Sequence, residues 1–410
     1  MKIDKLFHDS ACFTRETFQK RMSEFGFKNM GRMELFLWDL ELCLQIQKRL
    51  GERIVLKGGA ATQFYLPVEA QRTSVDIDML FYGKHEEIDA VLDDIRKDLS
   101  DGDGLFEFKE YFPENPKTGL PLYTYFAAVP SVLTAAERRT ENNIPARQEI
   151  KVEFILQPRK REYVSMLGEG LFTVKSHFKY RILPLDSLFA DKLSTLGCET
   201  IGVQNDRMDE QIKHFYDIIM LAKHCLPRMN GREIGKKYME RAKEEWEDRR
   251  GNEPFSIKPI MNDVYLQLRR YEQADTGNDK ELIKSINDFH SLYINSNVDF
   301  SPSFVACGAS FLRLLYRAVT GNVEWKVLAR VLEIEKKLEF SQFKGREKGV
   351  RVRRLRDRLV EKFAIDSALP VKILKGKNHK RVFWAVADPK NLGGIERLIS
   401  EIAALENNSE

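Results

Sequence analysis

Residues 56–83, LKGGAATQFYLPVEAQRTSVDIDMLFYG, constrain the fold more than any other stretch of the 410-residue chain. A short apolar run ends there in the glycine pair Gly58 and Gly59, and a second apolar run carries Asp76 and Asp78 one residue apart. Alternate side chains of a strand project to the same face. The sequence therefore predicts two carboxylates side by side on one face of a strand, shortly after a glycine turn and a helix start.

This acidic pair needs a positive partner if both carboxylates are to stay ionised. Charges about 4 Å apart repel by about 4 kcal/mol at an effective dielectric of 20. A divalent cation removes the repulsion, since Mg²⁺ prefers carboxylate oxygens, phosphates and water, and two such ions can hold the attacking and leaving oxygens of a phosphoryl transfer. The simpler alternative is an exposed strand face whose acids contact solvent or an arginine. The glycine pair favours the metal site, because backbone N–H groups at a helix start can receive a phosphate.

Hydrophobic periodicity divides the chain into a mixed α/β half and a helical half. It predicts helices at 14–50 and 84–100, and strands at 53–59, 73–83, 105–112, 122–129 and 148–157. From Pro184 the helical pattern continues to about residue 295. The predicted fold class is α+β, a small mixed sheet with helices followed by a helical region and a basic C-terminal α/β module. The predicted domains are 1–190, 191–298 and 299–410.

The C-terminal third is distinctly basic. Between Lys336 and Arg381 there are about 16 Lys and Arg against about 5 Asp and Glu, although the whole chain carries only +4. Such charge supplies sequence-independent affinity for nucleic acid, and exposed aromatics can stack on bases. The alternative is a solvated helix whose arginines pair with the acidic remainder. The residues predicted to bind nucleic acid are Lys344, Arg346, Arg351, Arg353, Arg354 and Arg356, with Phe340, Phe343, Phe383 and Trp384 as the aromatics.

Two strand-like runs, LPVKILKG at 369–376 and KRVFWAVA at 380–387, follow these helices. Helices followed by two short strands are compatible with a winged-helix-like module.

Nothing in the composition indicates a membrane or an oxidising compartment. No run of eighteen apolar residues occurs, and the N-terminal residues lack the pattern of a signal peptide, so we expect a cytoplasmic protein. The five cysteines are scattered and form no CxxC pair, which argues against a disulfide framework and against a zinc site.

Several motifs resemble those of a known family. LKGGAATQFY followed by RTSVDID is similar to the first motif of the DNA polymerase beta-like nucleotidyltransferases, specifically of the AbiEii/AbiGii-type toxins. The pattern of that group is GG or GS, a spacer and then R-x-S-x-D-x-D. In this chain Arg72, Ser74, Asp76 and Asp78 occupy the four specified positions of its second half. In FADKLSTL, Lys192 resembles the lysine motif of the group, and in IKHFYDIIML, Asp217 resembles the closing aspartate of its final motif. The resemblance covers about residues 50–225.

The resemblance also implies a third carboxylate on a strand beside the acidic pair. In QEIKVEFILQ, at 148–157, Glu149 and Glu153 alternate with apolar residues. Glu153 lies deepest in the apolar run, so we expect it to be the third acid. Glu149 is the substitute, and an exposed strand face is the simpler alternative.

Lys192 and Asp217 lie in apolar stretches of predicted helices. A lysine there can reach a triphosphate as a point charge, and the alternative is an ordinary solvated lysine. Asp217 would orient Lys192 or Arg207, with a buried salt bridge between helices as the equal alternative.

By resemblance, the chain is an enzyme, a Mg²⁺-dependent nucleotidyltransferase that moves an NMP from an NTP to a hydroxyl acceptor, for example a tRNA 3′ end. It would act as the toxin of a toxin–antitoxin or phage-defence system, with an NTP, tRNA or other RNA, and a cognate antitoxin as partners. The implied site residues are the metal ligands Asp76, Asp78 and Glu153, which are also catalytic, the further catalytic residues Lys192 and Asp217, and the nucleotide-binding residues Gly58, Gly59, Thr62, Arg72, Ser74 and Lys192.

The chain departs from the family pattern in two motifs. Ala60 follows the glycine pair where a hydroxyl is common, so a phosphate contact would rest on backbone amides or on Thr62. Glu210 and His214 stand where the final motif has an arginine and an acid, with Arg207 as a nearby substitute. These departures keep open a catalytically degenerate protein that binds RNA or a partner on the same scaffold. A glycosyltransferase that holds a sugar nucleotide through D-x-D is less favoured, since such enzymes do not need the glycine-lined helix.

Overall fold

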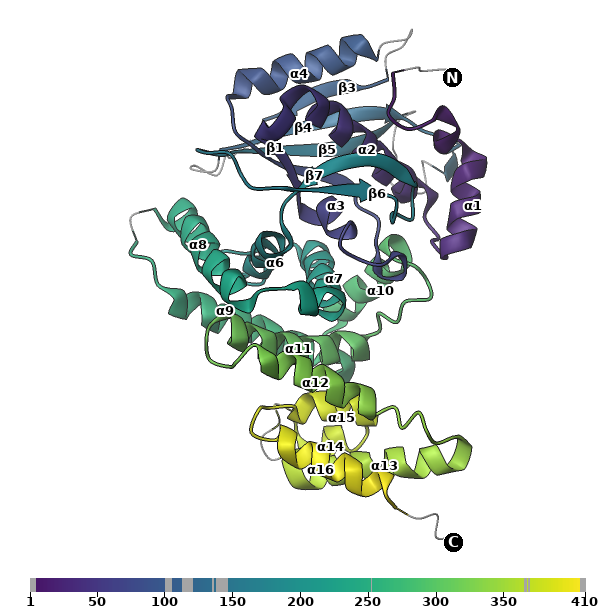
Figure 1. Ribbon diagram of the computed structural model, residues 1–410, viewed down its shortest axis with the longest axis vertical. Helices are drawn as coiled ribbons and strands as arrows, with labels where there is room; N and C mark the ends of the chain where they lie inside the picture. The colour runs from purple at the N-terminus through teal and green to yellow at the C-terminus, as the bar shows by residue number, and fades with distance from the viewer. Residues whose placement is uncertain are drawn as a thin grey trace.

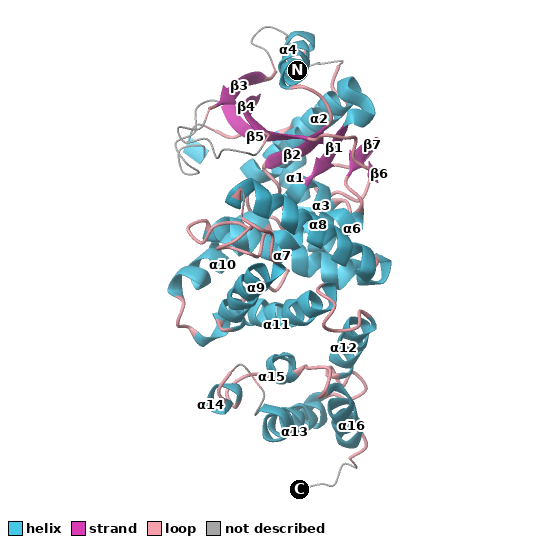
Figure 2. Cartoon of the chain, turned by 90° about the vertical axis from the view of Figure 1, so that its left-hand side faces the viewer, coloured by secondary structure: helices cyan, strands magenta, loops and turns pink. Residues whose placement is uncertain are grey.

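The computed structural model describes residues 5–99, 105–112, 121–134, 136–137, 147–251, 253–364, 367 and 369–405. Figure 1 shows three layers along the longest axis: a sheet with its helices, a helical middle and a small helical module at the C-terminal end. The strands gather at one end of the molecule and helices make up the rest (Figure 2). The α+β fold class is confirmed.

The sheet has seven strands in the order β3-β4-β5-β2-β1-β7-β6. It is mixed, because β2 runs antiparallel to β1 but parallel to β5. The central position of β1 and β2 explains why their apolar residues are buried, apart from the half-buried Leu80 on the face of the acids. The bounds are β1 Ile54–Lys57, β2 Asp76–Phe81, β3 Glu107–Tyr111, β4 Leu122–Pro130, β5 Arg147–Leu156, β6 Val164–Gly168 and β7 Ser176–Ile182.

Two strands at one edge, β6 and β7, are absent from the predicted elements. Their side chains are largely exposed, and β7 carries three consecutive exposed residues, His177 to Lys179. The apolar alternation that identifies a half-buried strand is therefore missing.

Helices cover both faces of the sheet. The helix α2, Met30–Leu50, packs against β1, β2, β5 and β7, and α4, His85–Asp98, packs against α2 and β3. The predicted single helical region is divided, because Gly26 ends α1, Arg15–Phe25, at a φ of 74° and the Asn29 side chain caps the start of α2. On the opposite side, α3, Gly58–Gln63, contacts β1, β2, α6 and α7 (Figure 1).

The remaining helices form the middle layer and the C-terminal module. In the middle layer α9 and α11 pack together, and α11 also contacts α15, so α11 touches both parts. Among the described helices, none is both long and apolar enough to cross a membrane. The bounds are α6 Leu185–Ser194, α7 Met208–Cys225, α8 Gly231–Arg250, α9 Ile257–Glu272, α10 Lys280–Tyr293, α11 Pro302–Val319, α12 Lys326–Lys337, α13 Gly345–Phe363, α14 Val371–Leu374, α15 His379–Val386 and α16 Leu392–Ala403.

The two strands predicted near the C-terminus are wrong. The residues 369–376 contain the short helix α14, and 380–387 contain most of α15. The Asn378 side chain accepts from the Arg381 N–H and caps α15, whose residues from Arg381 to Val386 are all buried. A short run that is apolar on every side gives no periodicity by which a helix can be told from a strand. The described part of 299–410 therefore has helices without strands, and the winged-helix-like and α/β interpretations of this module are corrected.

Candidate active site

The acidic pair lies on one face of β2, as predicted. Asp76 and Asp78 are half-buried, whereas Ile77 and Met79 between and after them are fully buried on the other face. This alternation follows from the pleat of the strand.

The parallel pairing of β2 and β5 brings the third acid beside the pair. Asp78 stands opposite Glu153 and Asp76 opposite Lys151, and Lys151 Nζ lies 2.5 Å from Glu153. Glu149 lies beyond the start of β2 and is exposed, so the structure favours Glu153 in the position that we predicted.

The electrostatics of Asp78 reflect this crowding. Burial, and next the charge of Glu153, raise the pKa of Asp78 to about 6, while Lys57 and Lys192 oppose the shift. Two carboxylates in one site resist ionising together. A cation bound between Asp78 and Glu153 would therefore favour ionisation of both carboxylates.

The glycine pair lies directly against these acids. Gly58 has a φ of +71°, and a Cβ there would lie 1.8 Å from Asp78 Oδ2. A Cβ on Gly59 would lie 2.6 Å from Arg72 Nη2 and 3.0 Å from Ser74 Oγ. The first turn of α3 thus meets the acidic strand and the R-x-S segment with no room for a side chain.

A buried ion cluster joins Arg72 of the R-x-S segment to α6 and α7. Arg72 donates to Asp217 from Nε at 2.7 Å and from Nη2 at 2.8 Å, and Lys192 Nζ donates to Asp217 Oδ2 at 2.8 Å. Burial opposes ionisation of Asp217, but the charges of Arg72 and Lys192 outweigh it and lower its pKa to about 2. Asp217 therefore pairs with Lys192, a contact that fits both the orienting role and the buried salt bridge between helices, and its second partner is Arg72, not Arg207.

The other final-motif residues lie differently. Arg207 pairs with Glu210 near the surface, away from Asp217. His214 accepts from Lys192 Nζ through Nδ1 at 3.2 Å, and burial, followed by the charge of Lys192, holds its pKa well below the usual value. A neutral imidazole is therefore part of the Lys192 environment.

The prediction for Thr62 disagrees with the structure. Its side chain is fully buried and its hydroxyl donates to the Gly58 carbonyl at 2.9 Å within α3. A hydroxyl engaged in this way is not available to a phosphate, which leaves the backbone amides at the start of α3.

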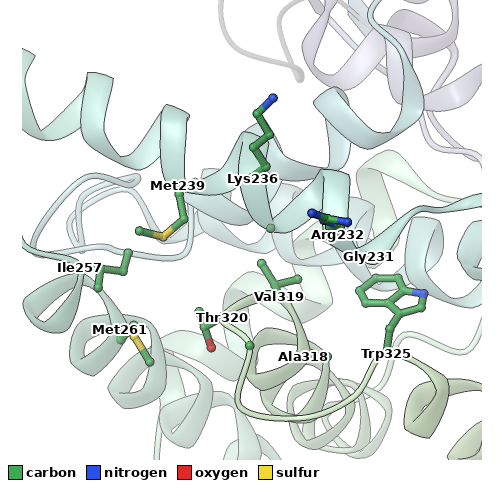
Figure 3. A pocket seen from close by; sticks show the side chains of 12 residues that line it. Gly231, Arg232, Lys236, Met239, Ile257, Met261, Ala318, Val319, Thr320 and Trp325 are labelled. Carbon is green, nitrogen blue, oxygen red and sulfur yellow. The ribbon is translucent and has the colours of Figure 1, made fainter.

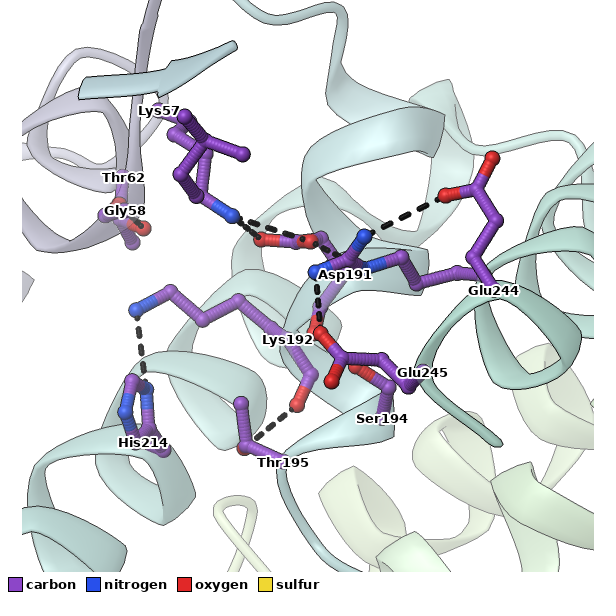
Figure 4. Close-up of polar contacts among 12 residues, drawn as sticks. Lys57, Gly58, Thr62, Asp191, Lys192, Ser194, Thr195, His214, Glu244 and Glu245 are labelled. Atoms are coloured by element: carbon purple, nitrogen blue, oxygen red, sulfur yellow. Dashed lines mark hydrogen bonds and ion pairs between the residues drawn. The ribbon is translucent and has the colours of Figure 1, made fainter. Parts of the chain in front are cut away.

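Sequence reasoning missed an ion cluster next to the glycine pair. Lys57, the residue before Gly58, reaches Asp191 at 2.9 Å, and Arg241 Nε of α8 lies 3.2 Å from the same carboxylate. In Figure 4, Lys57 extends from beside Gly58 toward Asp191, while Lys192 extends from α6 toward the side of Gly58. The available signal was local: Lys57 ends a buried strand, and Asp191 immediately precedes Lys192.

The basic C-terminal prediction is partly corrected. Lys344, Arg346, Arg353 and Arg354 are exposed on or beside α13, and Arg356 is half-exposed next to Asp357. Arg351, however, is buried, with its guanidinium 3.8 Å from the centre of the Phe343 ring and 3.0 Å from Glu347.

The aromatics of the same region are also mostly unavailable to bases. Phe340, Phe383 and Trp384 are buried, and Phe343 lies under Arg351. These residues build the core of the module, so the stacking prediction is wrong for them.

A second group with metal-ligating side chains lies between the start of α4 and β3. The ligand atoms of His85, Asp89 and Glu110 all lie within 4.8 Å of one another. His85 Nε2 is 2.8 Å from the Tyr125 hydroxyl, which donates to Asp89 at 2.7 Å. Among the described residues Asp76, Asp78 and Glu153 do not form a group this tight. Tyr125 pairs with Val152, whose side chain lies on the opposite face from Glu153, so this group is separate from the acidic pair.

A groove of about 590 Å³ opens in the middle layer, away from the acids. It lies between α8, α9 and the end of α11. Its lining includes the apolar side chains of Met239, Met261 and Trp325 and the basic residues Arg232 and Lys236 of α8 (Figure 3). None of the predicted site residues lines it.

Carboxylates that can hold a dication, placed against a helix start that can hold a phosphate, indicate the class of nucleotidyltransferases. The comparisons with known proteins give the family. A model of the nucleotidyl transferase AbiEii toxin family of type IV toxin–antitoxin systems matches residues 43–289, more than half of the chain. The chain therefore belongs to the AbiEii family and is a nucleotidyltransferase.

Solved structures similar to the chain include JHP933 from Helicobacter pylori, with 16% identity, a TM-score of 0.39, and coverage of 74% of this chain and 98% of that one. The nucleotidyltransferase toxin MenT4, Rv2826c, from Mycobacterium tuberculosis H37Rv has 12% identity and a TM-score of 0.40, with coverage of 95% and 99%. No curated protein matches the chain.

Proposed function

We propose that this chain transfers an NMP from an NTP to a hydroxyl of an RNA acceptor, for example a tRNA 3′ end, with Mg²⁺ as cofactor. The observation that carries the proposal is the meeting of three parts at one place. Asp78 faces Glu153 across β2 and β5, and the first turn of α3 approaches Asp78 so closely that only glycine is tolerated at Gly58.

The residues present suit a hard dication. Asp76, Asp78 and Glu153 offer carboxylate oxygens, and burial together with the charge of Glu153 raises the pKa of Asp78, which a bound dication would oppose. Mg²⁺ ions, when bound, would neutralise developing charge on the transferring phosphoryl group. The acids would hold these ions beside the nucleotide, and Glu153 would act as a third ligand or as the base that takes the proton of the acceptor hydroxyl.

The nucleotide would lie along the start of α3. The amides of Gly58 and Gly59 can donate to phosphate oxygens, and Ser74 lies close enough to Gly59 to join them. Lys192, held by Asp217, would supply a positive charge for the β- and γ-phosphates, which leave as pyrophosphate when the acceptor oxygen bonds to the α-phosphorus. Arg72 shares the same aspartate and steadies the segment that carries Ser74.

The exposed residues Lys344, Arg346, Arg353 and Arg354, with Arg356 beside them, would hold the RNA by its phosphates. The NTP and tRNA are molecules of the cytoplasm, where we place the reaction. As in the toxin–antitoxin systems of the family, a cognate antitoxin would counteract it.

The test is transfer of label. The protein is incubated with Mg²⁺, each of the four α-³²P-labelled NTPs in turn and total RNA, and the RNA is separated on a denaturing gel. We expect one NTP or more to label tRNA, and the double variant Asp76→Asn, Asp78→Asn to lose at least about 10²-fold in rate. Equal labelling by this variant would show that the acids are not the site.

The alternative of a degenerate scaffold, suggested by Glu210 and His214, is separated by calorimetry. A degenerate protein would bind RNA but show no Mg²⁺-dependent binding of any NTP.

A further inference from the structure

The side chain of Lys57 lies next to the acidic pair, although the family pattern of GG or GS, a spacer and R-x-S-x-D-x-D does not specify it. Lys57 is the last residue of β1, and its partner in the antiparallel pairing with β2 is Asp78. Partner residues of two paired strands project to the same face. Lys57 is also the N-cap of α3, so its ammonium group is carried by the residue that precedes the two glycines.

The ammonium group of Lys57 is buried, and Asp191 is the partner with which it forms an ion pair. The residue is 9% exposed, and the partners described for its Nζ are the two oxygens of Asp191, at 2.9 and 3.2 Å. An ammonium group has three donors. A donor therefore remains for an anion that reaches the start of α3.

Asp191 has a second cation of its own. Arg241 Nε lies 3.2 Å from Asp191 Oδ1, and Arg241 also pairs with Glu244 and Glu245 further along α8. Burial opposes ionisation of Asp191, but Lys57 and then Arg241 outweigh it and lower its pKa to about 2. If Lys57 is shared with an anion, Asp191 keeps a cation, and no buried carboxylate is left alone.

The same arrangement occurs twice around α3. Asp217 holds Arg72 and Lys192, and Asp191 holds Arg241 and Lys57. In each cluster one aspartate bridges two cations, one of which is a lysine. Both lysines also act on the charge of Asp78, which the first turn of α3 approaches, so both lie near the helix start where a triphosphate would place its negative charge.

We propose that Lys57 is a further phosphate-binding residue of this site, and that Asp191 and Arg241 are positioning residues that hold it there. The inference rests on the proposed function, because it takes an NTP as the ligand. Lys57 would donate to a non-bridging oxygen of the triphosphate while Arg241 retains Asp191.

Binding, measured without turnover, tests Lys57. Inorganic triphosphate and the α,β-methylene analogues of the four NTPs are titrated calorimetrically, with Mg²⁺, into the full-length protein. Loss of a charge-assisted hydrogen bond predicts that Lys57→Met weakens binding by about 10- to 100-fold and that Lys57→Arg recovers part of it. The matched control Lys179→Met, on exposed β7, should bind as the wild type does. Thermal unfolding checks that each variant is folded.

A double-mutant cycle tests the positioning pair. Arg241→Met leaves Asp191 with Lys57 alone, so we expect the lysine to be held away from the anion and binding to weaken. Adding Asp191→Asn removes the competing charge and should restore binding at least tenfold, on the order of one charge-assisted hydrogen bond. A merely structural role for Arg241 gives no such recovery.

The outcomes separate this inference from the proposed function. If the wild type binds an analogue and transfers label, but Lys57→Met binds within about twofold of it, the inference is wrong and the proposed function stands. If the wild type neither binds an analogue nor transfers label, the proposed function is wrong, and the inference with it.

Discussion

Gly58 combines two features that each require glycine: a positive φ and a close approach of its Cα to the Asp78 side chain. A φ of +71° disfavours any side chain, and a Cβ would lie 1.8 Å from Asp78 Oδ2. The glycine pair is thus explained by what lies across from it, which the sequence alone could not reveal. Gly59 has the same relation to Arg72 and Ser74.

Gly58→Ala should therefore damage the site more than the fold. We expect a loss of about 1–2 kcal/mol in the free energy of unfolding from the left-handed backbone. We expect transfer activity to fall by at least about 10²-fold, because Asp78 must move. Urea unfolding and the labelling assay measure the two effects.

The matched control is Gly277→Ala. Gly277 has a φ of +84° with open space where its Cβ would lie. It should share the loss of stability and keep full activity. A Gly58→Ala protein that is as active as this control would show that the approach to Asp78 is not required.

At the scale of elements, the pairing of β2 with β5 decides the site. The alternation of acids along β2 was visible in the sequence, so the shared face of Asp76 and Asp78 could be predicted. Glu153 was preferred to Glu149 because it lies deeper in its apolar run, after the family resemblance had implied a third acid. The register that puts Asp78 opposite Glu153 is a tertiary fact. Lys57 was missed for the same reason, since its partner Asp191 lies in a helix 134 residues away.

Where side-chain patterns were weak or uniform, prediction failed. The exposed strands β6 and β7 show no apolar alternation, and α15 is buried all round. The sequence alone therefore gave the centre of the sheet and most of the acidic site, but neither the edge of the sheet nor the fold of the C-terminal module.

The burial of Asp78, with Glu153 opposite it on β5, predicts a stability that depends on pH. The pKa of Asp78 is about 6 in the folded protein, above the ordinary value of 3.8. Below pH 4 Asp78 is protonated in both the folded and the unfolded state, so it does not affect the free energy of unfolding. As the pH rises toward 6, Asp78 ionises in the unfolded state first, and the free energy of unfolding falls. Above pH 6 Asp78 is ionised in both states, and the loss is complete. Asp78→Asn should therefore stabilise the metal-free protein by about 1–3 kcal/mol at pH 7 and by little at pH 4.

Urea unfolding at both pH values, in EDTA and in Mg²⁺, measures this effect. Mg²⁺ should stabilise the wild type and leave Asp78→Asn nearly unchanged. Glu24→Gln, an exposed carboxylate on α1, is the control and should show neither effect. An Asp78→Asn protein less stable than the wild type at pH 7 without metal would contradict the account of the pair.

At the scale of the whole molecule, the C-terminal module is fixed to the middle layer. Arg381 of α15 is 1% exposed; its Nε lies 3.2 Å from Asp275, and it also donates to the Glu272 carbonyl. Trp384 Nε1 donates to Glu335 at 2.7 Å, and α15 packs against α11. Buried polar contacts of this kind hold one orientation, so the basic surface of α13 has a set position relative to the sheet.

This arrangement assigns different tasks to the two ends of the molecule. Arg353 and Arg354 are both exposed on α13, and the double variant Arg353→Glu, Arg354→Glu reverses their charge. Because two phosphate contacts become repulsive, RNA binding should weaken by about tenfold or more. The slope of log Kd against log salt concentration should fall by about 2 to 4. Binding of the NTP analogues should stay unchanged, since the sheet lies at the other end of the chain (Figure 1). Filter binding at several salt concentrations measures the effect on RNA, and calorimetry measures the binding of the NTP analogues.

The control is the double variant Lys20→Glu, Lys28→Glu, which makes the same change in charge on exposed residues at the sheet end. If this control weakens RNA binding as much as the α13 variant does, the affinity comes from the net charge of the chain, and α13 is not the RNA-binding surface.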